Sequence, residues 1–176
     1  IWLMLKKYPF VIYGIGIAVG LVSIPLVFKR IRDDLKYGDA NAIDLPPINN
    51  TAITSPYGWR WGRMHNGWDL RAKSGSNVYA VADAVVKYAK NTEPNGCGGF
   101  IQLNHKDGLS TKYCHLKKFF VKKGDKVTKG QVIGLSGGGY NDPMKGNSMG
   151  DHLHYEVLVD GKAINPKYVH KNIKRA

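Results

Sequence analysis

Residues 150–157, GDHLHYEV, begin a run in which polar and apolar side chains alternate. This alternation predicts a β-strand with one polar face. Side chains at positions i and i+2 of a strand point to the same side, so His152 and His154 should project into one space. Two such histidines are either a solvated pair or part of a site. The rest of the chain decides between these two interpretations.

Further β-rich runs fill the chain from about Thr51 onward, separated by turns of Gly, Asp and Asn. Their sequences are NVYAVADAVVKYAK (77–90), GGFIQLNH (98–105), LSTKYCHL (109–116) and QVIGLSGG (131–138). One of the turns, Asp107-Gly108, predicts a β-hairpin. Because no long amphipathic helix is evident, we expect an all-β domain over residues 51–176, built as an antiparallel β-sheet or sandwich.

The N-terminal part of the chain has a different composition. Residues 9–28 contain no charged side chain and are long enough to cross a bilayer as a helix. Basic residues flank the stretch on both sides, which leaves its orientation undetermined. A cleaved signal peptide and a helix buried in a larger assembly are the alternatives, but no small-x-small cleavage site follows closely. We expect residues 1–30 to form one hydrophobic helix that anchors the chain in a membrane, and residues 31–50 to be a linker.

The charge of the chain points to an anionic partner. Its 26 Lys and Arg outnumber its 13 Asp and Glu, which gives a net charge of +13. Nucleic acid, acidic lipid and an anionic cell-wall polymer all fit such an excess. The basic residues are dispersed, without a zinc-finger or helix-turn-helix pattern. We therefore expect no specific nucleic acid, and the charge alone does not choose between acidic lipid and a wall polymer.

Two further segments supply groups that could join the histidine pair. RMHNGWDL places His65 four residues before Asp69, and Gly67 with Trp68 argues against a helix between them. In an extended stretch the two side chains share a face. His115 ends another predicted strand. Imidazole and carboxylate are good ligands for Zn²⁺, whose catalytic sites use three protein ligands and leave one position open.

In this order, HxxxD, a YxHL-like segment and HxH followed by an aromatic residue and Glu resemble the lysostaphin-type (LytM-like) zinc endopeptidases. The matching segments are SPYGWRWGRMHNGWDL (55–70), TKYCHLKK (111–118) and GDHLHYEV (150–157). The glycine-rich connectors also match, and the resemblance covers about residues 52–168. It implies an enzyme that cuts peptide bonds in bacterial peptidoglycan, in cross-bridges or in stem peptides.

The resemblance also implies a role for each residue of the set. His65, Asp69 and His154 would hold one zinc ion, while His115 and His152 would be catalytic histidines that do not bind it. Histidine suits proton transfer because its reference pKa lies near neutrality. Which of the two acts as general base stays open. The peptidase domain is expected to face the cell wall from the membrane, or to belong to a phage virion.

Two alternatives to the enzyme remain. Some members of the resembling family have lost their ligands and regulate other wall enzymes, but here all five positions carry the expected residue types. The run VKKGDKVTKGQVIGLSG (121–137) is also similar to biotinyl and lipoyl carrier domains, with Lys145 as the residue to be modified. The connector 137–154 looks longer than the corresponding connector of the endopeptidases. A loop there would border the cleft, so the resemblance does not establish which substrate is preferred.

The two cysteines lie near the predicted hairpin. If the hairpin turns at Asp107-Gly108, Cys114 faces approximately Ile101, and only a bend at the glycines after Cys97 would bring the sulfurs together. A disulfide and a pair of buried free thiols both fit. Cys114 is not expected to be a zinc ligand, because it should point away from its neighbour His115.

Overall fold

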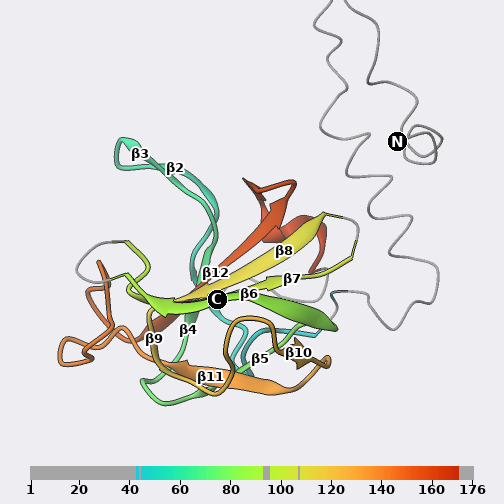
Figure 1. Ribbon diagram of the computed structural model, residues 1–176. Coiled ribbons are helices and arrows are strands. Elements are labelled where there is room, and N and C mark those ends of the chain that lie inside the picture. The colour runs from blue at the N-terminus through green and yellow to red at the C-terminus, as the bar shows by residue number, and fades with distance from the viewer. Residues whose placement is uncertain (1–42, 44, 93–95, 107, 171–176) are drawn as a thin grey trace, which may run out of the picture.

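The computed structural model describes residues 43, 45–92, 96–106 and 108–170 (Figure 1). The predicted hydrophobic helix 1–30, with its membrane span 9–28, lies outside the described residues, as does most of the predicted linker. Within the described ranges, no helix is long and apolar enough to cross a membrane.

The described residues form β-strands joined by tight turns, with one short 3-10 helix, η1 (Pro166–Tyr168), and no α-helix. The strands are β1 (Ile53–Ser55), β2 (Gly58–Arg60), β3 (Arg63–His65), β4 (Trp68–Arg71), β5 (Asn77–Tyr79), β6 (Ala84–Asn91), β7 (Gly99–Asn104), β8 (Leu109–Cys114), β9 (Leu116–Phe119), β10 (Lys126–Val127), β11 (Val132–Ser136), β12 (His152–Val159) and β13 (Lys162–Ile164). All their pairings are antiparallel. The all-β, antiparallel prediction is confirmed.

The described strands form three sheets. The largest has the strand order β1-β4-β12-β8-β7-β6-β10, with β13 also paired to β12. A smaller sheet, β5-β11-β9, lies along one side of it, and the β2–β3 hairpin projects from the body of the domain (Figure 1). The quoted run that begins at residue 150 becomes β12, which pairs with β4 on one side and β8 on the other. The histidine strand is therefore central to the main sheet.

The core draws apolar side chains from both larger sheets. Leu70 and Leu153 of the main sheet and Val78 and Ile133 of the smaller one are fully buried in one hydrophobic cluster. Each such side chain stabilises the fold by roughly 1.5–3 kcal/mol through burial. Ile48, which lies before Thr51, is also buried in this cluster, so the core uses residues of the 31–50 stretch.

The predicted hairpin is formed by β7 and β8. Asn104 pairs with Ser110 and Ile101 pairs with Tyr113. The chain turns back between the two strands, and Gly108 has a φ of +74°, which suits glycine at this turn. β8 pairs along its whole length with β12, and this register places Cys114 opposite His154.

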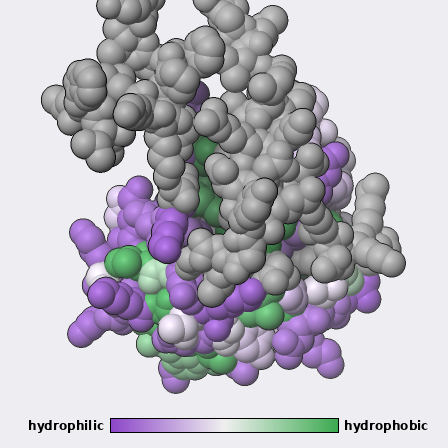
Figure 2. Space-filling view, turned by 90° about the vertical axis from the view of Figure 1, so that its right-hand side faces the viewer, coloured by the Kyte–Doolittle hydropathy of each residue, from purple (hydrophilic) through white to green (hydrophobic). Residues whose placement is uncertain are grey.

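Hydrophilic and hydrophobic residues are mixed on the surface. On the face drawn in Figure 2, hydrophilic residues surround smaller hydrophobic areas. This agrees with the dispersed basic residues seen in the sequence.

Candidate active site

The register of the main sheet brings the first site residues together. Asp69 of β4 lies directly opposite His154 of β12, and His154 lies opposite Cys114 of β8. Directly opposed residues of antiparallel strands project to the same face. His152, two residues before His154, shares this face as expected from the strand alternation. One row of the sheet thus carries a carboxylate and an imidazole side by side.

His65 reaches the row from the β2–β3 hairpin. The sequence suggested a single extended stretch from His65 to Asp69, but the structure divides it between β3 and β4, which belong to different sheets. Gly67 lies at the break. A Cβ atom on Gly67 would collide with the carbonyl oxygen of Tyr155 in β12, so glycine allows this close approach. The side chains of His65 and Asp69 still converge.

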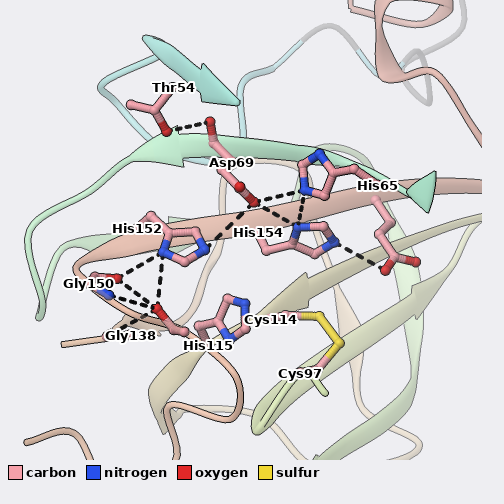
Figure 3. Close-up of polar contacts among 12 residues, drawn as sticks. Thr54, His65, Asp69, Cys97, Cys114, His115, Gly138, Gly150, His152 and His154 are labelled. Carbon is pink, nitrogen blue, oxygen red and sulfur yellow. Dashed lines mark hydrogen bonds and ion pairs between the residues drawn. A yellow bond between two sulfur atoms is a disulfide. The ribbon is translucent and has the colours of Figure 1, made fainter. Parts of the chain in front are cut away.

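Three donor atoms meet at the centre of the site (Figure 3). Nε2 of His65 lies 3.1 Å from Oδ1 of Asp69, and Nδ1 of His154 lies 2.8 Å from the same oxygen. The two nitrogens are 3.0 Å apart. Ligand atoms of a tetrahedral Zn²⁺ are separated by about 3.3 Å when the bonds are about 2.0 Å long. The spacing of the three donors therefore fits one zinc ion.

The far edge of each of these two imidazoles is occupied. Nδ1 of His65 donates to the carbonyl oxygen of Pro56 over 2.7 Å, and Nε2 of His154 donates to Oε1 of Glu156 over 3.2 Å. In the neutral form of each ring, the unprotonated nitrogen then lies on the side of Asp69. Three electron-rich atoms this close repel one another unless a proton or a metal cation lies among them. The donor set and its outer contacts suit zinc.

The second oxygen of Asp69 is held by an arginine. Nη2 of Arg60, on β2, lies 3.3 Å from Oδ2 of Asp69. This contact turns Oδ1 toward the histidines. It also ties the projecting hairpin to β4, so the hairpin that carries His65 is fixed at two points.

The electrostatic field at this centre favours positive charge. Burial opposes ionisation of Asp69, but its contacts with His154 and His65 outweigh burial and hold the pKa of this carboxyl well below its usual value. Burial likewise disfavours the charged form of His154, yet the carboxylates of Asp69 and Glu156 raise its pKa. A place that stabilises a proton on a buried imidazole also stabilises a metal cation.

His115 follows the last residue of β8 and has a φ of +60°. This left-handed conformation is uncommon for a residue other than glycine, and such residues often lie at functional sites. It ends the strand alternation, so Cys114 and His115 do not point to opposite faces as the sequence suggested. The His115 ring centroid lies 4.7 Å from that of His152 and 6.0 Å from that of His154.

Both of the predicted catalytic histidines donate Nδ1–H to residues 137–151, the part of the predicted connector 137–154 that precedes β12. We call this segment the connector 137–151. Nδ1 of His115 donates to the carbonyl oxygen of Lys145 over 2.8 Å, and Nδ1 of His152 donates to that of Gly150, also over 2.8 Å. The hydroxyl of Ser148 lies 3.2 Å from the same nitrogen of His152. These contacts leave Nε2 of each neutral ring unprotonated, and Nε2 of His152 lies 3.6 Å from Oδ1 of Asp69.

The state of charge of His115 follows from its surroundings. Its burial, and then the neighbouring imidazoles of His152 and His154, lower its pKa to about 4. The ring is therefore neutral near pH 7 and can accept a proton at Nε2. All five residues that the sequence predicted for the site thus lie in one cluster.

Cys97 and Cys114 form a disulfide beside this cluster (Figure 3). The register differs by one residue from the expected one, since Tyr113 lies opposite Ile101. The chain bends at Gly98, whose φ is +59°, and this returns Cys97 to Cys114. Cys114 does lie on the face of His154, contrary to the expectation from alternation, but its sulfur is engaged in the bridge.

Large exposed hydrophobic side chains lie on the two segments that also contribute to the cluster. Among the described residues, four are at least 75% exposed, and all of them lie on the β2–β3 hairpin or on the connector 137–151. They are Trp59, Trp61, Tyr140 and Met149. A cavity of about 420 Å³ lies elsewhere, lined by residues 48–50 and parts of β4 and β5.

Sequence reasoning did not assign the groups that orient the cluster. Glu156 could have been found, because it lies two residues after His154 and so shares its strand face. The carbonyl of Lys145 and the hydroxyl of Ser148 gave no such signal. They come from a connector without regular structure and reach the histidines only through the three-dimensional fold.

Comparison with known proteins gives the same family along most of this domain. The profile of Peptidase family M23 matches residues 63–166. The peptidoglycan DD-endopeptidase ShyA of Vibrio cholerae is 42% identical over 146 residues, which are 81% of this chain and 30% of that protein. Stage II sporulation protein Q of Bacillus subtilis is 35% identical over 103 residues, 58% of this chain and 35% of that protein. The chain thus spans about a third of the length of these relatives.

Solved structures share the fold. A zinc-containing peptidase from Vibrio cholerae superposes with a TM-score of 0.61 at 32% identity, covering 72% of this chain and 39% of that one. The antimicrobial peptidase lysostaphin from Staphylococcus simulans gives a TM-score of 0.61 at 31% identity, covering 71% of this chain and 51% of that one.

Proposed function

This chain belongs to Peptidase family M23, and on that premise we propose that it is a zinc-dependent endopeptidase that hydrolyses peptide bonds in bacterial peptidoglycan. Family membership confirms the resemblance to lysostaphin-type peptidases read from the motifs. One observation carries the proposal: the three donor atoms of His65, Asp69 and His154 lie within 3.1 Å of one another, with His115 and His152 beside them.

The proposed division of labour assigns the metal to three residues and proton transfer to two. His65, Asp69 and His154 would hold Zn²⁺, which supplies Lewis-acid chemistry by polarising a carbonyl and acidifying water. Nε2 of a neutral His115 or His152 can take a proton from an attacking water. The same ring can then return the proton to the leaving amine, because its Nδ1 stays bonded to a backbone carbonyl.

Peptidoglycan as the substrate rests on the named activity of ShyA and on the surface of this chain. The net charge of +13 favours an anionic polymer, and the exposed aromatic side chains of the β2–β3 hairpin and of the connector offer it apolar contacts. Analysis of the released fragments would identify the bond that is cut, either in a cross-bridge or in a stem peptide. Wall remodelling in a bacterium and lysis by a phage-encoded or virion-borne enzyme would both use this activity.

Two other functions receive less support. A non-catalytic regulator would not need two histidines whose tautomers are fixed beside a complete donor set. A biotinyl or lipoyl carrier would present its lysine on a turn between paired strands. Lys145 instead lies between β11 and β12, which belong to different sheets, and its Nζ donates to the carbonyl oxygen of Ser148.

We propose further that residues 9–28 anchor the chain in a membrane and that the peptidase domain faces the cell wall. The uncharged length of this segment carries the proposal. The full chain should fractionate with membranes and resist extraction by alkaline carbonate. Recovery of the full chain in the soluble fraction without detergent would contradict the anchor.

The function is tested by mass analysis of fragments released from purified cell walls of several bacteria. We expect fragments with new amino and carboxyl termini at a peptide bond. A chelator should stop their release, and added zinc should restore it. Release that continues in the chelator after zinc has been removed, or fragments cut only at glycosidic bonds, would contradict the proposal.

A further inference from the structure

Two segments far apart in the sequence meet along a line of glycines beside His115. We call this contact, between residues 96–99 and residues 144–147, the glycine seam. Two backbone hydrogen bonds join it: the amide of Gly99 donates to the carbonyl oxygen of Met144 over 2.8 Å, and that of Asn147 donates to the carbonyl oxygen of Gly96 over 3.0 Å.

The seam leaves no room for a side chain. A Cβ atom on Gly98 would collide with the carbonyl oxygen of Met144, and one on Gly146 would collide with that of Gly96. Both glycines also have positive φ values, +59° and +58°. Glycine is thus required at these positions both by the backbone conformation and by the close approach of the two chains.

The seam holds His115 at two points. The amide of His115 donates to the carbonyl oxygen of Cys97 over 2.8 Å, and its Nδ1 donates to that of Lys145, also over 2.8 Å. One contact comes from each side of the seam. The position of the main chain and the orientation of the ring therefore both depend on the two sides staying together.

The Cys97–Cys114 disulfide closes this arrangement covalently. It joins one side of the seam to the residue that precedes His115. His115 has left the strand, with a φ of +60°, so the ladder of β8 does not continue through it. The bridge therefore supplies, at this point, a restraint that β-sheet pairing does not.

We propose that the Cys97–Cys114 disulfide and the glycine seam are positioning groups for His115, and that hydrolysis is fast only while the disulfide is intact. The inference rests on the proposed peptidase function. Reduction would leave the metal ligands on their strands but release the segment that holds His115. The enzyme would then reach full rate only in an oxidising compartment, such as the wall side of a membrane.

The first test compares oxidised and reduced full-length protein loaded with zinc. A trialkylphosphine reduces the bridge: it becomes the phosphine oxide with the oxygen of one water, whose two protons complete the two thiols. We expect kcat for cleavage of a peptidoglycan-derived peptide to fall by about 10- to 100-fold, the scale of a misplaced catalytic group, with KM within about twofold and zinc content unchanged. The Cys97→Ala/Cys114→Ala variant should show the lower kcat and should not respond to the phosphine.

A second readout does not depend on activity. Nitrogen chemical shifts of the imidazoles should show His115 as the Nδ1-protonated neutral tautomer in the oxidised protein. After reduction this ring should exchange between tautomers, while the shifts of the metal-binding histidines stay the same. If the oxidised protein cleaves no peptidoglycan, the proposed function fails, but the tautomer of His115 still decides whether the bridge positions it.

Glycine variants test the seam itself. Gly146→Ala should lower kcat about as much as reduction does, because the new methyl group forces the two segments apart. Gly161→Ala is the matched control, since Gly161 also has a positive φ, +78°, but open space around its Cα. It should leave kcat unchanged. Equal kcat in oxidised and reduced protein would overturn the proposal, and so would loss of zinc or of β-structure on reduction, which would make the bridge a general stabiliser.

Discussion

The two halves of the site are held by different kinds of structure. Asp69 and His154 face each other across two paired strands, and His65 ends a third. His115 and His152 instead depend on carbonyls of the connector 137–151 for their orientation. The proposed metal half (His65, Asp69 and His154) is therefore held mainly by strands. In the proposed proton-transfer half (His115 and His152), a connector orients both rings, and the disulfide lies next to His115. Damage to the first half should remove the metal, and damage to the second should slow the reaction with the metal in place.

The largest effect is expected for the two neighbouring histidines of β12. His154→Ala should abolish zinc binding and activity, because it removes one of three donors. His152→Ala should keep zinc, since its Nε2 lies 3.6 Å from Asp69 and outside the three-donor set. The measurement is zinc content of the purified variants by elemental analysis. Equal zinc loss in both variants would mean that His152 contributes to zinc binding as much as His154 does.

His115→Ala should produce a loss in rate alone. The variant lacks a group that transfers a proton or stabilises the developing charge, so kcat should fall on the order of hundreds-fold. Zinc content and KM should change little. The measurement is steady-state cleavage of a soluble peptide, with zinc content determined on the same sample. A variant that has lost zinc as well would place His115 in the metal half.

The same division explains how much of the site could be predicted from the sequence. Strand alternation placed His152 and His154 on one face, and the motif order identified His65, Asp69 and His115 as their companions. Alternation failed at Cys114 and His115, because it assumes a continuing strand and the chain leaves β8 at His115 with a positive φ. The support from Lys145 and Ser148 could not be predicted, since it arises where two irregular segments meet.

The fold shows the same limit. Short β-rich runs with glycine turns predicted the antiparallel strands and the hairpin β7–β8. Their division into a main sheet, a smaller sheet and the β2–β3 hairpin depends on contacts between distant strands. In the sequence, the segment from His65 to Asp69 looks like one extended stretch, and nothing there indicates the break at Gly67 that separates β3 from β4. Only its contact with Tyr155 shows why the chain bends there.

A smaller effect is expected when an outer contact of the metal half is removed. Glu156→Ala should weaken zinc binding by about 10- to 100-fold, because the Nε2–H of His154 loses its acceptor. Glu156→Gln is the matched variant, since its amide oxygen can still accept this bond, and it should bind zinc more tightly than the alanine variant. Competition with a chromogenic chelator measures both affinities. Wild-type affinity in Glu156→Ala would show that the strands alone orient His154.

Binding of the wall polymer should depend on residues outside both halves of the site. Replacing Lys118, Lys122 and Lys123 with glutamine should reduce cleavage of whole walls several-fold at low salt and leave cleavage of a short neutral peptide unchanged. The reason is that these exposed charges act through long-range attraction, which salt screens within about 8 Å at physiological ionic strength. Lys117 is left intact because its Nζ contacts Ser74 and Asp142. Loss of peptide cleavage in the triple variant would place these lysines in the fold or the site.

The smallest effect concerns a histidine at the other end of the β7–β8 hairpin. His105 lies beside the turn, with Nδ1 donating to the carbonyl oxygen of Asp83 and Nε2 2.8 Å from Oγ1 of Thr111. Burial is the main influence on this ring and lowers its pKa below the usual value of 6.5. The unfolded chain then binds a proton more readily than the folded one as the pH falls below about 6.5. This contribution to stability is therefore complete above that pH and is lost progressively on acidification.

Denaturant unfolding of wild type and His105→Gln at pH 7.5 and pH 5.5 tests this dependence. Wild type should be the more stable protein at pH 7.5, and the difference in free energy of unfolding should narrow at pH 5.5. The narrowing cannot exceed about 1.4 kcal/mol for each pH unit below 6.5, and it should be smaller because the ring is only partly buried. The other ionisable groups are the same in both proteins, so their contributions cancel in the comparison. A difference that stays constant between the two pH values would mean that His105 has the same pKa in the folded and unfolded chains.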